Sequence, residues 1–171
     1  MKSIVLCCCL LVAVGGWAAA TAPPAAAAIH LTAPEKAVLA LINHARTTRG
    51  RHAVRVVASL ERGSRAHSRD MLRRGYFSHS SSSGSSYAAR LRAFGYSATG
   101  CTCWKVGEII GYGRGAKAVA RVFRQWMKSP VHRAVILQRS FRDIGVGRVA
   151  GTLGGLDGVS MFTVDFGRRV K

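Results

Sequence analysis

The chain has 171 residues, of which 26 are lysine or arginine and 7 are aspartate or glutamate, for a formal net charge of +19 at pH 7. This length predicts one domain that buries roughly two thirds of its surface and needs no disulfide framework. The basic residues are scattered along the chain, which indicates a solvated surface that attracts polyanions and excludes a localised nucleic-acid-binding segment.

Residues 1–28 have the pattern of a secretory signal peptide followed by an Ala/Pro-rich linker. Lys2 provides the positive start, residues 4–14 form the apolar run, and small residues offer Ala-x-Ala cleavage sites. The run is short for a membrane span and ends at Gly15-Gly16, so a cleaved leader is expected rather than an anchor. No other stretch can span a membrane. We therefore expect a secreted, monomeric protein with one domain at residues 29–171.

Two cysteines remain once the leader, with Cys7 to Cys9, has been removed. Cys101 and Cys103 are separated by a single residue and lack the spacing of a zinc site. In an oxidising compartment they could form a strained Cys101–Cys103 disulfide or stay reduced. The sequence leaves both states open.

The first helix is predicted at residues 33–49, after a capping box formed by Thr32 and Glu35. Asn43 and Arg46 share one face of it and are expected to bridge the helix to neighbouring backbone.

A loop at 51–58 should lead to a second helix at 60–74, with Ser59 as its N-cap and Gly75 as its end. His67, on this helix, is expected to be a packing residue.

The rest of the chain mixes helical and strand patterns. A polar loop at 80–86 and a glycine-rich turn at 111–115 are predicted between these helical and strand segments. Helix Ala116–Met127 should end before Pro130. Strands with hairpin connections at the end of the chain indicate an α+β domain with helices packed on a small antiparallel sheet. The remaining predicted elements are a helix at 87–94, a strand at 104–112, a helical turn at 132–138, a strand at 143–149, a turn at 151–158 and a strand at 159–166.

Six short segments then occur in an order that is typical of one family. Each is weak alone, but together they are specific, and the chain resembles the CAP superfamily of sperm-coating, cysteine-rich secretory, antigen-5 and plant pathogenesis-related class-one proteins. The similarity is greatest to its short secreted bacterial branch and covers about residues 33–168. It implies a three-layer α-β-α sandwich with a small, mainly antiparallel central sheet. The segments are Leu41–Arg46, Ala66–His79, Gly107-Glu108, Trp126–Arg133, Asp143–Gly147 and Phe162–Gly167.

In animal and plant members of this family a cleft carries two histidines and two glutamates. By motif, His79 and His132 match the histidines and Glu108 matches one glutamate. The sequence departs from the pattern at Ile109, which replaces an asparagine, and at 127–129, where the second glutamate is missing. The resemblance therefore implies that His79, Glu108 and His132 meet in one cleft, with the two rings within reach of one bridging ion or water.

These three residues allow more than one role. His79 and His132 could bind a divalent metal such as zinc, with Glu108 completing or orienting the set. A hydrogen-bonded cleft without a cofactor is the simpler expectation. Glu108 could also be a general base, although neutralising a buried histidine is favoured.

Three functions are consistent with this sequence. The first is a binding module for a lipid-like or cell-envelope ligand, without enzymatic activity. The second is a metal-assisted hydrolase or peptidase that uses His79, Glu108 and His132. The third is an extracellular binder of polyanions such as an anionic cell-envelope polymer. No motif supports specific nucleic-acid binding, and Ser129 lacks the Gly-x-Ser-x-Gly context of a nucleophile.

Overall fold

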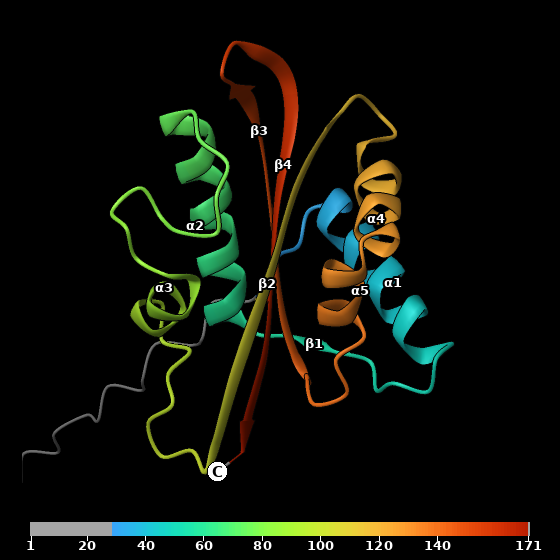
Figure 1. Ribbon diagram of the computed structural model, residues 1–171, viewed down its shortest axis with the longest axis vertical. Coiled ribbons are helices and arrows are strands. Elements are labelled where there is room, and N and C mark those ends of the chain that lie inside the picture. Colours follow the sequence, from blue (N-terminus) through green and yellow to red (C-terminus); the bar gives the residue numbers. More distant parts are fainter. Residues whose placement is uncertain (1–28, 171) are drawn as a thin grey trace, which may run out of the picture.

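The computed structural model describes residues 29–170, so the predicted signal peptide and linker lie outside the described residues. Within these residues, five helices and four strands form three layers, with the sheet seen edge-on in the middle (Figure 1). This confirms the predicted α-β-α sandwich. The elements are α1 (Ala33–Thr47), β1 (Arg55–Val56), α2 (Ala58–Arg74), α3 (Tyr87–Ala93), β2 (Cys103–Arg114), α4 (Ala118–Lys128), α5 (Pro130–Ile136), β3 (Asp143–Leu153) and β4 (Leu156–Val170).

The strand order in the sheet is β1-β3-β4-β2. β4 pairs antiparallel with both β2 and β3, whereas the two residues of β1 pair parallel with the start of β3. The sheet is therefore mainly antiparallel, as predicted. β2 is a long edge strand, because β4 is its sole partner in the sheet.

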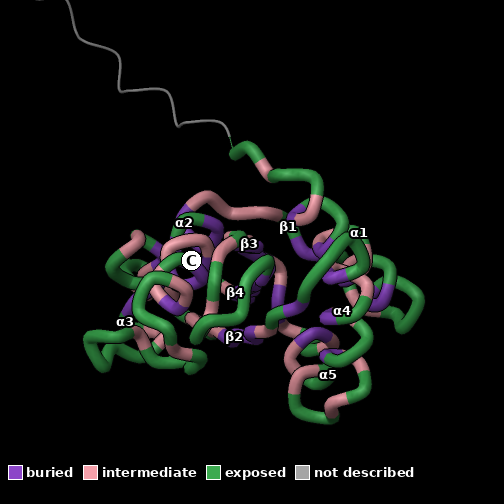
Figure 2. The backbone as a smooth tube through the Cα atoms, turned by 90° about the horizontal axis from the view of Figure 1, so that it is seen from above, coloured by how far each residue is buried: buried purple, intermediate pink, exposed green. Residues whose placement is uncertain are grey.

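Helices cover both faces of the sheet. α2 and α3 lie on one face, and α1, α4 and α5 lie on the other (Figure 1). Viewed along the strands, buried residues concentrate where the helices meet the sheet (Figure 2). The larger apolar core lies on the α1/α4/α5 face and includes Ile42, Trp126, Phe162 and Phe166.

The start of the fold follows the sequence closely, with two corrections. The Glu35 carboxylate accepts a hydrogen bond from the backbone N–H of Thr32, as the capping box predicts, and a second one from the Thr32 hydroxyl. The loop predicted at 51–58 contains β1, which the sequence could not indicate because its partner lies 88 residues away. The prediction that Ser59 is the N-cap of the second helix is wrong. Val57 is the N-cap of α2, and its carbonyl accepts the N–H of Glu61.

The glycine-rich segment at 111–115 is mostly strand, not the predicted turn. β2 continues to Arg114, in register with β4 as far as Val159. Its glycines serve close packing, because a Cβ at Gly111 would lie 2.8 Å from a side-chain carbon of Val122 on α4. The predicted turn at 151–158 is likewise mostly strand, since β3 runs to Leu153 and β4 starts at Leu156.

Two smaller predictions also change. Pro130 begins α5 rather than only ending the preceding helix, as suits a residue that needs no N–H partner in the first turn. Cys101 and Cys103 are free thiols, so the disulfide is absent from this structure.

Candidate functional site

A cleft of about 700 Å³ lies beside the edge strand β2, between the segment that follows α2 and the helices α4 and α5. Both faces of the sheet contribute to it because it wraps around this edge. His79 and His132 lie on its wall, one from each side. The full lining is Phe77, Ser78, His79, Ile110, Gly111, Tyr112, Gln125, Trp126, Ser129 and His132.

His79 is held by a buried acid. Its Nδ1 lies 2.7 Å from Oε1 of Glu108. The Glu108 side chain is fully buried, whereas that of His79 is 51% exposed. An ionised carboxylate only accepts hydrogen bonds, so the proton of the imidazole resides on Nδ1. The exposed Nε2 is therefore the ring nitrogen that is left for a ligand.

Arg90 fixes the other oxygen of this acid. Its guanidinium Nη2 contacts Oε2 of Glu108, and the Arg90 side chain is only 6% exposed. Arg90 also donates to the Ser81 hydroxyl at 2.9 Å. Both oxygens of Glu108 are thus occupied by cationic or N–H partners. Sequence analysis missed Arg90, since nothing distinguishes it from the other arginines along the chain.

A second buried acid lies next to Glu108. Asp165 on β4 is its cross-strand partner and is completely buried. Burial and the negative charge of Glu108 raise the pKa of Asp165 well above its usual range. The Ser64 hydroxyl lies 2.6 Å from Oδ2 of Asp165 and 2.9 Å from the carbonyl of Leu60. That hydroxyl has one proton for two acceptors, so a protonated Asp165 satisfies both contacts.

Asp165 could have been noticed in the sequence. It interrupts an otherwise apolar run between Val164 and Phe166, and a carboxylate there must be paired or protonated.

His132 reaches the cleft from α5. Its Nδ1 lies 2.8 Å from the hydroxyl of Ser129, which precedes the helix. Burial and the nearby His79 lower the pKa of His132. A neutral His132 is therefore favoured near pH 7. His79 and His132 both line the cleft. Of these two histidines, Glu108 contacts only His79.

A zinc site with three protein ligands does not match these residues. No group of three His, Cys, Asp or Glu among residues 29–170 lies close enough to hold a metal ion. Glu108 is engaged by His79 and Arg90, so it orients an imidazole and has no free oxygen to act as a third ligand. Two imidazoles alone fall short of the three protein ligands typical of catalytic zinc.

Aromatic side chains also line the cleft. Phe77 and Tyr112 pack edge to face with ring centroids 5.2 Å apart, yet they remain 46% and 41% exposed. The indole N–H of Trp126 donates to the carbonyl of Ile110 at 2.8 Å, which fixes the floor. Exposed large apolar groups beside each other are typical of a binding surface.

Three other residues singled out in the sequence are structural. His67 is buried, and its Nε2 lies 2.8 Å from the carbonyl of Ser78. Asn43 exchanges two hydrogen bonds with the backbone of Val54. Arg46 is fully buried and donates to four carbonyls, those of His52, Ile136, Gln138 and Phe141.

Comparison with known sequences identifies a family. Residues 39–166 match the model of the cysteine-rich secretory protein family, CAP. The chain is 34% identical over 119 residues to the uncharacterized protein YkwD of Bacillus subtilis (strain 168). That alignment covers 70% of this chain but only 44% of the relative.

Solved structures show the same fold. An outer surface protein of Borrelia burgdorferi superimposes with a TM-score of 0.67 at 20% identity, covering 82% of this chain and 96% of the other. An extracellular protein with an SCP domain from Bacillus anthracis (strain Ames) gives a TM-score of 0.62 at 22% identity, covering 79% and 40% of the two chains. Among residues 29–170, no helix combines the length and apolar character that crossing a membrane requires.

Proposed function

The chain belongs to the cysteine-rich secretory protein (CAP) family, and on this premise we propose that it is a secreted binding module for an amphipathic cell-envelope ligand. The apolar part of the ligand packs on Phe77 and Tyr112. Its polar head lies toward His79 and His132. The site is the cleft beside β2, and the proposal involves no catalytic step.

One observation carries this proposal. The cleft is lined both by an exposed aromatic pair and by two imidazoles. Its volume of about 700 Å³ lies within the range of small-molecule sites. The imidazoles offer hydrogen bonds to a polar head, and the aromatic rings offer the apolar contact that lipid chains need. An amphipathic molecule satisfies both kinds of lining residue.

Export supports a ligand of this class. Residues 1–28 have the composition of a leader, and a cell-envelope ligand requires a protein outside the membrane. We expect the mature protein to be recovered from the medium or the cell surface. Its N-terminus, determined by sequencing, should lie between residues 19 and 30 of the sequence.

The binding experiment uses a defined lipid. Purified protein is titrated with 1-palmitoyl-lysophosphatidylglycerol below its micelle concentration, and binding is followed by calorimetry. Phe77→Ala should weaken binding about tenfold, because losing roughly 1.4 kcal/mol of apolar contact corresponds to that factor. Leu156→Ala is the matched control, since Leu156 is an exposed apolar residue distant in sequence from the cleft. Equal affinity for the two variants, or no binding by the parent protein, would contradict the proposal.

A hydrolase remains the second candidate. The contact between His79 and Glu108 favours it, because a carboxylate behind an imidazole fixes the ring orientation and leaves the exposed Nε2 to act on a substrate. Such an enzyme would use the imidazole as a base and would not depend on a three-ligand metal. Hydrolysis of a peptide or ester that is lost in His79→Ala but retained in His67→Gln would support it. Activity that is unchanged in His79→Ala would exclude it.

A further inference from the structure

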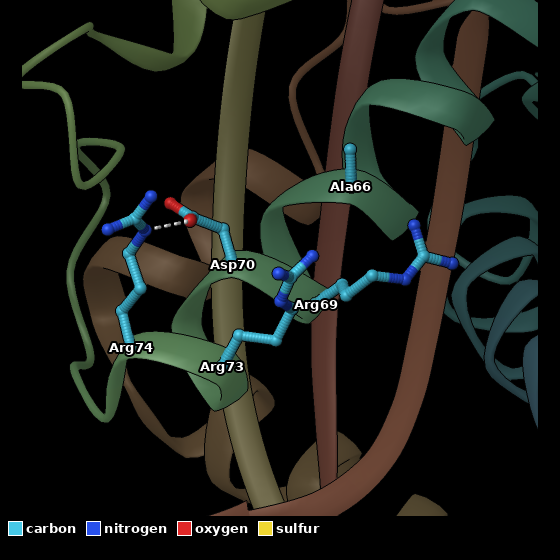
Figure 3. A pocket seen from close by; sticks show the side chains of 5 residues that line it. All are labelled: Ala66, Arg69, Asp70, Arg73 and Arg74. Atoms are coloured by element: carbon cyan, nitrogen blue, oxygen red, sulfur yellow. Dashed lines mark hydrogen bonds and ion pairs between the residues drawn. The ribbon is translucent and has the colours of Figure 1, made fainter.

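The outer face of α2 has a second concave site, away from the cleft. It has a volume of about 360 Å³ and is lined by Ala66, Arg69, Asp70, Arg73 and Arg74. Their spacing, three and four residues apart, places them along one side of the helix. Figure 3 shows Asp70 and Arg74 turned toward each other, while Arg69 extends to the other side.

The single acid of this site is already occupied. Asp70 accepts from Arg74 at 3.1 Å and from the Tyr76 hydroxyl. It also accepts from the backbone N–H and hydroxyl of Ser82. Burial raises the pKa of Asp70, but these hydrogen bonds and the charge of Arg74 outweigh it and lower the pKa to about 2. Asp70 therefore stays ionised and neutralises Arg74, and it leaves Arg69 and Arg73 uncompensated.

No other acid of the chain serves these two arginines. All seven acidic residues lie in the part of the chain that the structure describes, and each contacts another group. The side chains of Arg69 and Arg73 form no hydrogen bond or ion pair with any of residues 29–170, and both residues are exposed. Both guanidinium groups are therefore available to an anion from another molecule.

The geometry favours phosphate over carboxylate. Arg69 and Arg73 are four residues apart, about 6 Å along the helix axis. One guanidinium can satisfy both oxygens of a planar carboxylate, whereas a tetrahedral phosphate presents oxygens in more than one plane and can be shared by two guanidinium groups. The small Ala66 leaves the floor of the site open for the linker between successive phosphates.

We propose that Arg69 and Arg73 form a binding site for a phosphodiester-linked polyol polymer of the cell envelope. Each guanidinium donates to non-bridging phosphate oxygens. The polyol that links successive phosphates lies over the small side chain of Ala66. Arg74 remains paired with Asp70 and borders the site. This site is independent of the cleft, and its occupant differs from the amphipathic ligand proposed there.

The test compares charge-matched variants of the full mature protein. Fluorescently labelled poly(glycerol phosphate) of about ten repeats is titrated, and anisotropy is measured at two salt concentrations. Arg69→Gln with Arg73→Gln should weaken binding about tenfold or more, as expected for losing hydrogen bonds to a charged group. Arg121→Gln with Arg124→Gln is the control, because it removes the same charge from an exposed face of α4. The control should change affinity less than about threefold, through the general field alone.

Two further variants separate the site from general charge attraction. Arg69→Lys with Arg73→Lys keeps the charge but loses the bidentate geometry, and we expect a loss of about threefold to tenfold. Ala66→Glu keeps both arginines but fills the floor with a carboxylate, and binding should be lost, while the helix tolerates glutamate well. Equal losses in the α2 and α4 pairs, equal affinity for single-stranded DNA of the same charge, or an unaffected Ala66→Glu would each overturn the proposal.

Discussion

The two faces of the sheet are built from the same strands but bury opposite kinds of side chain. On β4, Phe162 and Phe166 point to the α1/α4/α5 face and join one large apolar core. Alternate residues, Thr163 and Asp165, are equally buried but polar. They face α2, where the apolar clusters are small and separate. The α1/α4/α5 face buries a continuous apolar core. The α2 face buries polar side chains that form hydrogen bonds as well as small apolar clusters.

The hydrogen bonds of the polar face depend on the close approach of α2 to the sheet. Gly147 on β3 allows the α2 backbone to lie against the strand, since a Cβ there would be 2.2 Å from the backbone nitrogen of Arg65. At this separation the Ser68 hydroxyl lies 3.0 Å from the carbonyl of Gly147 and 2.9 Å from the Thr163 hydroxyl. The Ser68 and Thr163 hydroxyls in this layer thus have hydrogen-bond partners, and the same layer holds Glu108 behind His79.

The largest expected effect lies on the apolar face. Phe162→Ala should lower the free energy of unfolding by about 4 kcal/mol, because it removes a fully buried ring and leaves a cavity. Urea unfolding measures this change. Leu156→Ala, at an exposed position of the same strand, should cost less than about 0.5 kcal/mol. A loss below about 2 kcal/mol for Phe162→Ala would show that this core is not the main source of stability.

Gly147→Ala tests the close approach on the polar face. The added methyl meets backbone atoms of α2 that cannot move independently, so we expect a loss of about 3 kcal/mol in the free energy of unfolding. Gly151→Ala is a matched control on the same strand. Its Cβ would meet the flexible end of Leu72 at 3.2 Å, and the cost should stay below about 1 kcal/mol. Similar costs for the two variants would mean that α2 does not depend on this contact.

Sequence patterns predicted local features better than those that depend on tertiary contacts. Helix ends such as Gly75, the capping box of α1 and the amphipathic α4 follow from local spacing, and these were correct within a few residues. The two-residue β1 has no local pattern and exists through its pairing with β3. Glycine-rich stretches were predicted as turns, although Gly111 serves helix packing, which is a property of the tertiary structure.

The site could be predicted only in part. The family resemblance pointed to His79, Glu108 and His132, and the structure places His79 against Glu108 and both histidines on one cleft. The partners that control Glu108 were not predictable, because Arg90 lies 18 residues away on another element and Asp165 lies 57 residues away. Metal binding and ligand class remain predictions.

Asp165→Asn tests the buried proton on the polar face. The pKa of Asp165 is raised in the folded state, so its contribution to stability is complete below the unfolded pKa near 4 and is lost as pH rises through the folded pKa. Asparagine has no proton to lose and can donate to Ser64. The variant should therefore gain stability relative to the parent as pH rises, by at most about 1.4 kcal/mol per pH unit. Urea unfolding from pH 4 to pH 9 measures the difference. A difference that is constant with pH would show that Asp165 is ionised in the folded protein.

The smallest effect is expected in the segment that follows α2 and leads to the cleft. Asp70 ties α2 to Ser82 and Tyr76, on either side of His79. Its pKa of about 2 lies below the unfolded value, so its stabilisation is present above about pH 4 and is lost as pH falls through 2. Asp70→Asn should cost about 1 kcal/mol at pH 6, a modest figure because the side chain is partly exposed to solvent. The same variant should speed amide exchange in residues 80–86, and the stability difference should shrink as pH falls through 2 and vanish about one pH unit lower, where both side chains are neutral. A difference that persists there would assign the effect to packing, whereas the predicted pH dependence would show that a charge-assisted tether positions the His79 loop.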